Sequence, residues 1–231
     1  MGAEESRQAE EELKKERENR QKDQAKIKRL EKQLAQAKAE QQEDPGTRTG
    51  RAAIAQCDRS LWKVIGNVFT FTGEDSATLL SFRYAAVVAR LTLTIRNTQD
   101  SVLDIGIISS SLVKKAFADN FLQLKGGAGW NLSAMFLYAQ QNFKDTNRGS
   151  ACEEGREGQR IVLEADGREG KRTLKLSQDG KTAPVFFTNI PVPFRFAMCL
   201  WTQKLAMEIE SVEVLEEAQM VGGTIAVAMD E

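Results

Sequence analysis

Three segments of the chain alternate between apolar and polar residues, and this pattern constrains the fold most. They span residues 91–95, 172–177 and 207–214. Because successive side chains of a β-strand point to opposite faces, a period of two predicts strands with one buried and one wet face. Other short apolar runs, rich in β-branched and aromatic residues and separated by turn residues, predict further strands. Many short antiparallel strands indicate an all-β sandwich or barrel.

The composition of the chain changes near Pro45. More than half of residues 1–44 are charged and none is aromatic, whereas the rest of the chain holds every aromatic residue. We therefore predict a charged helix over 1–44, a linker over 45–58, a β-sandwich over 59–217, and a C-terminal tail or edge strand over 218–231. Only the part of the chain after the charged helix holds enough apolar residues to bury a core.

Residues 1–44 are dominated by good helix formers, and acidic residues often precede basic ones by four positions, as in Glu10 and Lys14. Apolar residues recur with a spacing of three and four over 27–37 only, whereas a coiled coil usually shows about three or four heptads. Three interpretations stay open. The segment is a solvated single helix, a short coiled coil that forms weak homodimers through residues 27–37, or disordered.

The chain has 32 basic and 33 acidic residues and no histidine. This balance gives no general attraction to nucleic acid or to an anionic membrane. Three scattered cysteines without histidine cannot build the usual four-ligand zinc site, so we expect no metal and no other cofactor.

The charged N-terminus does not resemble a secretory signal, and no apolar run is long enough to span a membrane. We therefore expect a cytoplasmic protein.

No catalytic arrangement stands out among the residues. Adjacent carboxylates occur at positions 74–75, 153–154 and 216–217, but paired-carboxylate catalysis needs two acids that face each other across a cleft. Cys152 lies in a polar segment and is the cysteine that best fits an exposed thiol, yet the chain has no histidine to activate it. We expect a protein that is not an enzyme.

Three blocks within residues 103–201 carry a family resemblance. The first is the apolar strand 103–108, which has Gly106 between apolar residues. The second is the tryptophan-containing segment 129–133, and the third runs over 161–198 with an Asp-Gly turn and a proline-containing approach to its last strand. In order and spacing these blocks resemble a divergent SPRY (B30.2-like) domain, preceded here by a charged helix or coiled-coil segment.

The resemblance implies a bent antiparallel two-sheet β-sandwich of the SPRY/concanavalin-like kind, and the composition of residues 1–44 predicts a long N-terminal α-helix before it. It also implies a non-enzymatic adaptor that holds a peptide or a protein surface with loops at one end of the sandwich. Aromatic, arginine and amide side chains near loops are frequent anchors of such surfaces. On this physical ground the candidate partner-binding residues are Arg83, Tyr84, Trp130, Asn131, Tyr138 and Arg148. Trp130 and Tyr138 fit a place in the core equally well.

These expectations favour a protein–protein interaction module in which the helix is a spacer or an oligomerisation element. Two alternatives stay open. A component of a structural or cytoskeletal assembly would lay its charged helix along a partner. A carbohydrate-binding, lectin-like sandwich would use an aromatic platform.

Overall fold

The computed structural model describes residues 47–229, with gaps at 59, 74–75, 98–102, 117–120, 134, 140–141, 145–150 and 202–204. The chain divides into two units after Asp44, and the described residues belong to the second. The helix predicted over 1–44 and the dimer seam predicted over 27–37 therefore lie outside the described residues.

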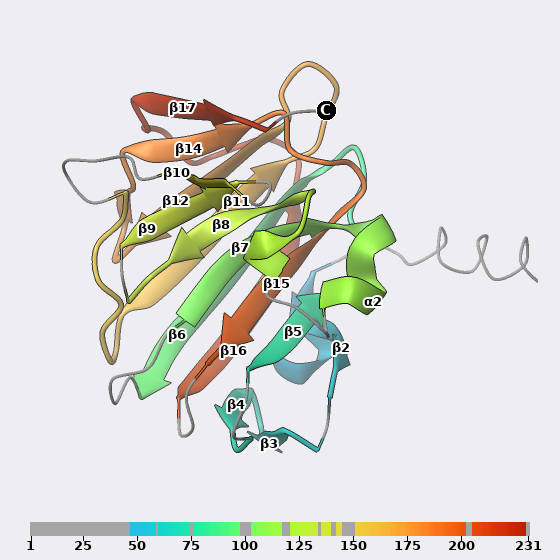
Figure 1. The fold of residues 1–231 in the computed structure, drawn as a ribbon, viewed down its shortest axis with the longest axis vertical. Coiled ribbons are helices and arrows are strands. Elements are labelled where there is room, and N and C mark those ends of the chain that lie inside the picture. The colour runs from blue at the N-terminus through green and yellow to red at the C-terminus, as the bar shows by residue number, and fades with distance from the viewer. Residues whose placement is uncertain are drawn as a thin grey trace, which may run out of the picture. The chain divides into compact units, whose positions relative to one another are not determined.

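The larger of two sheets holds ten strands in the described part of the chain (Figure 1). They are β1 (Arg48–Thr49), β3 (Trp62–Ile65), β4 (Val68–Phe71), β6 (Val88–Asn97), β11 (Arg160–Asp166), β12 (Thr173–Gln178), β13 (Lys181–Thr182), β14 (Val185–Thr188), β16 (Ala206–Leu215) and β17 (Ile225–Ala228). Their order is β17-β14-β12-β11-β6-β16-β4-β3, with β1 beside β16 and β13 beside β12. The pair β14–β17 is parallel, and the other pairs are antiparallel.

The smaller sheet is antiparallel and holds seven strands in the described residues. They are β2 (Ile54–Cys57), β5 (Ala77–Ser81), β7 (Leu103–Ser109), β8 (Gly127–Asn131), β9 (Phe136–Ala139), β10 (Asn142–Lys144) and β15 (Phe194–Leu200). Their order is β10-β9-β8-β7-β15-β5-β2. The two sheets enclose one large apolar core, so the predicted all-β two-sheet sandwich is confirmed.

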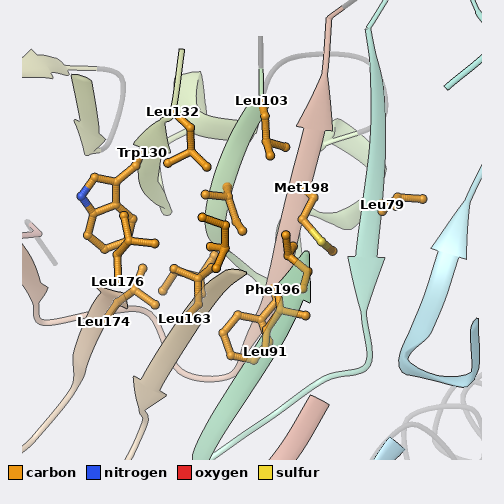
Figure 2. Packing of buried hydrophobic residues seen from close by; sticks show 14 of the residues in the cluster. Leu79, Leu91, Leu103, Trp130, Leu132, Leu163, Leu174, Leu176, Phe196 and Met198 are labelled. Atoms are coloured by element: carbon orange, nitrogen blue, oxygen red, sulfur yellow. The ribbon is translucent and has the colours of Figure 1, made fainter. Parts of the chain in front are cut away.

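The core lies between the two sheets and follows the alternation seen in the sequence. In β6, Leu91, Leu93 and Ile95 are buried in it, while Thr94 and Arg96 bind glutamates of β16 on the outer face. Figure 2 shows leucines of β6, β11 and β12 facing side chains of β7, β8 and β15. Each large side chain buried in this way stabilises the fold by about 1.5–3 kcal/mol.

Two tight turns show how local sequence sets the strand boundaries. Asp179 and Gly180 both have positive φ, 49° and 82°, and join β12 to β13 in a two-residue hairpin. The Asp-Gly signal therefore marks a hairpin, as such pairs usually do. A second turn at Gly66 and Asn67 divides the apolar run 62–72 into the separate strands β3 and β4.

The predicted linker over 45–58 is wrong for most of its length. Its residues form β1, the 3₁₀ turn η1 (Gly50–Ala53) and β2, which pair with β16 and β5. Ala53 is fully buried in the core, and Ile54 and Cys57 pack against it. The segment lacks an alternating pattern because its strands are short and only a few of its side chains reach the core.

The C-terminal segment, for which a tail and an edge strand stayed open, ends in an edge strand. Residues 225–228 form β17, which pairs in register with β14 at the edge of the larger sheet. Before it, the backbone crosses the outer face of this sheet and is held by side chains of β11 and β12. The amides of Gln219 and Met220 donate to the buried carboxylate of Glu164, at 3.1 and 2.8 Å, and Lys175 Nζ donates to the carbonyl of Met220 at 2.9 Å.

A helical insertion covers the outer face of the smaller sheet. It holds η2 (Ser110–Leu112), α2 (Val113–Ala116) and η3 (Phe121–Gln123) (Figure 1). A second apolar cluster lies under it, formed by Leu80, Ile108, Ala116, Phe121, Leu122, Leu124, Ala197 and Cys199. The insertion thus gives this sheet a second buried face. In the described part of the chain no helix has the length and apolar character of a membrane span.

Candidate functional site

The directions of the strands bring four connections to one end of the sandwich, which we call the loop end. They are 82–87 between β5 and β6, 110–126 between β7 and β8, 167–172 between β11 and β12, and 189–193 between β14 and β15. The strand β17 finishes at the same end because it runs parallel to β14. Loops held by a rigid sandwich are a common place for binding residues.

A groove of about 410 Å³ opens at the loop end, and we call it the loop groove. Three of the four connections and the residue after β17 contribute to it. It is lined by Ser109, Ser111, Leu112, Lys125, Gly126, Arg172, Asn189, Ile190, Pro191, Val192 and Met229. Its size falls within the range of about 300–1,000 Å³ that is typical of ligand sites.

Backbone hydrogen bonds tie the segments of the loop groove to one another and to the sheets. They run from the amide of Ile190 to the carbonyl of Arg172 (3.2 Å), from Ser110 to Pro193 (3.0 Å), from Ser109 to Gly126 (2.9 Å) and from Met229 to Thr188 (3.0 Å). Each of the three contributing connections is therefore fixed by at least one bond. Because the groove is formed before binding, a ligand does not have to order these loops, and the loss of conformational entropy on binding is smaller.

The walls of the loop groove are mainly apolar. Ile190 and Met229 are buried, with 0% and 2% of their surface exposed, while Leu112, Pro191 and Val192 are half-buried at its side. When an apolar group of a ligand covers half-buried apolar side chains at a concave surface, the removal of their remaining surface from water stabilises the complex. The groove can therefore take up an apolar side chain.

Two hydroxyls and two cations complete the loop groove. Ser109 Oγ and Ser111 Oγ lie 2.9 Å apart, and Lys125 and Arg172 are exposed at the rim. None of the described residues that line the groove carries a carboxylate. Among the described residues, none of the ion pairs includes Lys125 or Arg172. The polar part of the groove is therefore cationic.

Two of the predicted partner-binding residues, Arg83 and Tyr84, lie at the loop end beside the groove. Tyr84 is buried, and its backbone exchanges two hydrogen bonds of 2.9 Å with Phe194, directly after the groove loop 189–193. The two rings stand 6.0 Å apart. Tyr84 thus holds the base of this loop, while Arg83 is half-buried and does not line the groove.

Trp130 and Asn131 do not line the loop groove. Trp130 is fully buried between the sheets (Figure 2). Its ring stands edge-to-face against that of Phe187, with 4.9 Å between the ring centroids. Of the two positions that the sequence allowed for Trp130, a binding surface and the core, the structure therefore shows the core. Tyr138 is in β9, paired with Phe143 and Gly129, and Arg148 lies outside the described residues.

Asn131 donates a hydrogen bond to the buried carboxylate of Asp104 at the opposite end of the smaller sheet. Its Nδ2 donates to Asp104 Oδ1 at 2.7 Å, and Trp201 Nε1 donates to Asp104 Oδ2 at 2.7 Å. Asp104 is 1% exposed and Asn131 is 8% exposed. A buried carboxylate needs such donors because an unpaired charge in the interior is strongly unfavourable. Asn131 therefore stabilises the fold here and is covered from solvent.

A second hollow, of about 570 Å³, lies along β2, β3 and the neighbouring strands β4 and β5. Apolar side chains such as Leu61, Val64 and Phe69 line it together with Arg51 and Asp58. Its charged lining is balanced, and it borders the edge strands of both sheets, β2 and β3. This hollow is an alternative binding position, and an experiment that locates a bound ligand distinguishes it from the loop groove.

Two described thiols are buried, and two carboxylates of the larger sheet are held in ion pairs. Burial raises the pKa of Cys152 and of Cys199 to about 12, so neither is a thiolate near neutral pH. On the outer face of the larger sheet, Glu164 binds Arg90 at 2.5 Å and Glu210 binds Arg160 at 3.1 Å. These carboxylates act in ion pairs. In the described residues no cluster of three or more metal-ligating side chains occurs.

The residues that matter at the loop groove were missed by the sequence analysis. Lys125 precedes a glycine-rich stretch that reads as a tight loop, and Arg172 belongs to an alternating strand pattern. Pro191 lines the groove and belongs to the segment that the sequence marked only as a proline-containing approach to the last core strand.

No family model matches the sequence, and no curated protein matches it either. Solved structures similar to this chain include the SPRY domain of human HERC1, with 14% identity over 71% of this chain and all of that one and a TM-score of 0.46. They also include an endo-1,3-β-glucanase from Streptomyces sioyaensis (9% identity, 73% and 87% coverage, TM-score 0.41) and peanut lectin (8%, 76% and 95%, 0.40).

Proposed function

We propose that this chain is a non-enzymatic protein–protein interaction module that holds a short peptide segment in the loop groove. The observation that carries the proposal is the groove's construction. Three connections are fixed by backbone hydrogen bonds around apolar walls, with polar groups at the rim. Specific sites typically combine such a preformed apolar surface with a few placed polar groups.

The depth of the groove favours a peptide over a large flat protein surface. A volume of about 410 Å³ holds a small number of side chains. Val192 and Leu112 form its accessible apolar wall, while Ile190 and Met229 close it from below. One anchoring side chain that fills such a pocket often supplies most of the affinity of a peptide.

A selection experiment tests the proposal. A displayed library of random dodecapeptides is selected on the full chain, and the enriched peptides are measured by fluorescence polarisation on Val192→Asp and on Ile65→Asp. Ile65 is 66% exposed on β3, outside the groove, so its substitution is a matched control. We expect the enriched peptides to lose at least about tenfold in affinity on Val192→Asp only, since the charge removes the apolar wall. Equal binding to both variants, or no enrichment, would contradict the proposal.

The charged segment 1–44 completes the proposed function as a spacer or as a weak oligomerisation element. A dimer through residues 27–37 would raise the apparent affinity for a clustered target without a new contact. In the full chain, Leu30→Asp with Leu34→Asp should then lower affinity for peptide-coated beads and leave affinity for the free peptide unchanged. If both affinities stay the same, the segment is a spacer only.

The two alternatives predict other outcomes. A structural assembly component would lose its cellular position when residues 1–44 are deleted, whatever happens to the groove. A lectin-like sandwich would bind glycans in an array, and Val192→Asp would not change the peptide selection because no peptide would be enriched.

A further inference from the structure

The ligand class of the loop groove can be read from its charges. Lys125 closes the insertion between β7 and β8, and Arg172 stands in the turn between β11 and β12. Two cations from two separate connections thus border one apolar groove. Both are exposed, so their charges are available to a ligand.

Lys125 and Arg172 differ from the arginines on the outer face of the larger sheet, which are in ion pairs. There Arg90 and Arg96 each bind a glutamate of a neighbouring strand, and Arg160 of β11 binds a glutamate of β16, two strands away. At the loop groove, the lining residues that the structure describes include no carboxylate that would neutralise Lys125 or Arg172. A partner that brings negative charge would find complementary charge there, and complementarity of this kind sets specificity and association rate.

The remaining polar atoms of the groove fit a carboxylate. Ser109 and Ser111 hydrogen-bond to each other at 2.9 Å, with either as the donor, and this leaves one hydroxyl hydrogen that can be donated to an acceptor on a ligand. The arginine and the lysine form charge-assisted hydrogen bonds with carboxylates. Two cations are few for nucleic acid, which is bound through many phosphates by a larger basic surface.

We propose, on the basis of the proposed function, that the loop groove selects an acidic peptide in which an apolar side chain lies next to one or two carboxylates. The apolar side chain packs on Leu112, Val192 and Met229, and the carboxylates bind Lys125 and Arg172. These two cations determine the specificity of the site, while the apolar wall supplies most of its affinity.

The test is a peptide array on the full chain. Each peptide carries one apolar residue (Leu, Ile, Val, Phe or Met) flanked by Asp and Glu, by Asn and Gln, or by Lys and Arg. We expect the acidic set to bind best, and its binding to weaken as salt rises from 50 to 300 mM because rim charges are screened. Lys125→Gln and Arg172→Gln should each weaken acidic peptides by about fivefold and leave amide-flanked peptides nearly unchanged.

Charge reversal gives the sharper result. The double variant Lys125→Glu with Arg172→Glu should prefer the Lys- and Arg-flanked set, while the control Lys63→Glu, an exposed lysine on β3, should keep the acidic preference. If inorganic phosphate displaces the acidic peptides at equal ionic strength, the site is a general anion site and the proposal fails. Peptides that lose binding on Val192→Asp but show no acidic preference would overturn this inference and leave the proposed function intact. A chain that enriches no peptide would overturn both.

Discussion

Gly106 of β7 and Gly129 of β8 lie directly opposite each other in the smaller sheet, and neither has room for a side chain. A Cβ on Gly106 would collide with the carbonyl oxygen of Ala128, and one on Gly129 with the carbonyl oxygen of Ile105. The two strands approach closely at this point because both positions are glycine. The insertion that carries Lys125 connects these two strands, so this contact also positions one side of the loop groove.

Replacement of Gly106 by alanine should therefore destabilise the protein strongly. We expect Gly106→Ala to lower the free energy of unfolding by about 3 kcal/mol, since the colliding atoms are backbone and cannot move aside cheaply. Urea denaturation measures this. The control is Gly158→Asn, where φ is +79° and no atom lies within 4 Å of an added Cβ; asparagine tolerates this backbone conformation. Equal losses in the two variants would show that the close approach is not important.

Loss of the buried carboxylate of Asp104 should leave two donors without their acceptor. Asp104→Ala removes the partner of Asn131 Nδ2 and of Trp201 Nε1. We expect a loss of about 2–4 kcal/mol in the free energy of unfolding, measured by urea denaturation. The exposed Glu157 provides a control, whose replacement by alanine should change stability by no more than about 0.5 kcal/mol. A similarly small effect of Asp104→Ala would mean that solvent reaches the site.

The three thiols should differ in reactivity. Cys152 and Cys199 are buried with pKa values raised to about 12, whereas Cys57 is half-buried on the edge strand β2. At pH 8 an aromatic disulfide reagent should therefore titrate one thiol in the native protein and three in urea. Cys57→Ser should abolish the native reaction. Reaction of two or three native thiols would contradict the burial of Cys152 and Cys199.

The same burial predicts a loss of stability at alkaline pH. In the unfolded chain both thiols ionise near their ordinary pKa of about 8.5, while in the folded chain they keep their protons up to about pH 12. Between these values the unfolded state binds fewer protons, so stability falls as pH rises. The variant Cys152→Ala with Cys199→Ala should lose less stability between pH 8 and pH 10 than the native chain, as measured by urea denaturation. Identical pH dependence would contradict the raised pKa values.

The contacts of Glu164 predict that it holds the C-terminal segment against the larger sheet. Glu164→Ala should expose the amides of Gln219 and Met220, whose acceptor is lost, and raise their hydrogen exchange by at least about tenfold. Glu213→Ala is the control, because Glu213 accepts from Ser211 and not from the C-terminal segment. Unchanged exchange at both amides would show that Glu164 is not needed, and that the Lys175 contact and the pairing of β17 hold the segment.

Much of the sandwich follows from local sequence. The alternation in β6 predicts its buried and exposed faces, and the Asp179-Gly180 pair predicts a hairpin, because side-chain period and turn conformation are local properties. The same reasoning fails for β8, whose Gly-Ala-Gly sequence resembles a loop. Gly129 is in a strand because a neighbouring strand leaves no room for a side chain, and this is a property of the folded pair.

The candidate site was harder to predict for a similar reason. A tryptophan next to a loop fits an exposed anchor and a core residue equally, and the neighbouring Phe187 decides that Trp130 is buried. Conversely, Lys125 and Arg172 are 47 positions apart in the sequence. They share a groove only because β11 and β7 both end at the loop end. Contacts between residues so far apart in the sequence depend on the strand topology, which local sequence patterns do not reveal.

The most direct test of the central claim is to locate a bound peptide. An enriched peptide that carries a photoreactive benzoylphenylalanine at its apolar position is crosslinked to the full chain, and the attachment sites are mapped by mass spectrometry. The account predicts crosslinks within residues 109–112, 125–126 and 189–192, at the loop groove. Crosslinks confined to residues 51–78, which border the hollow between the sheet edges, would contradict it.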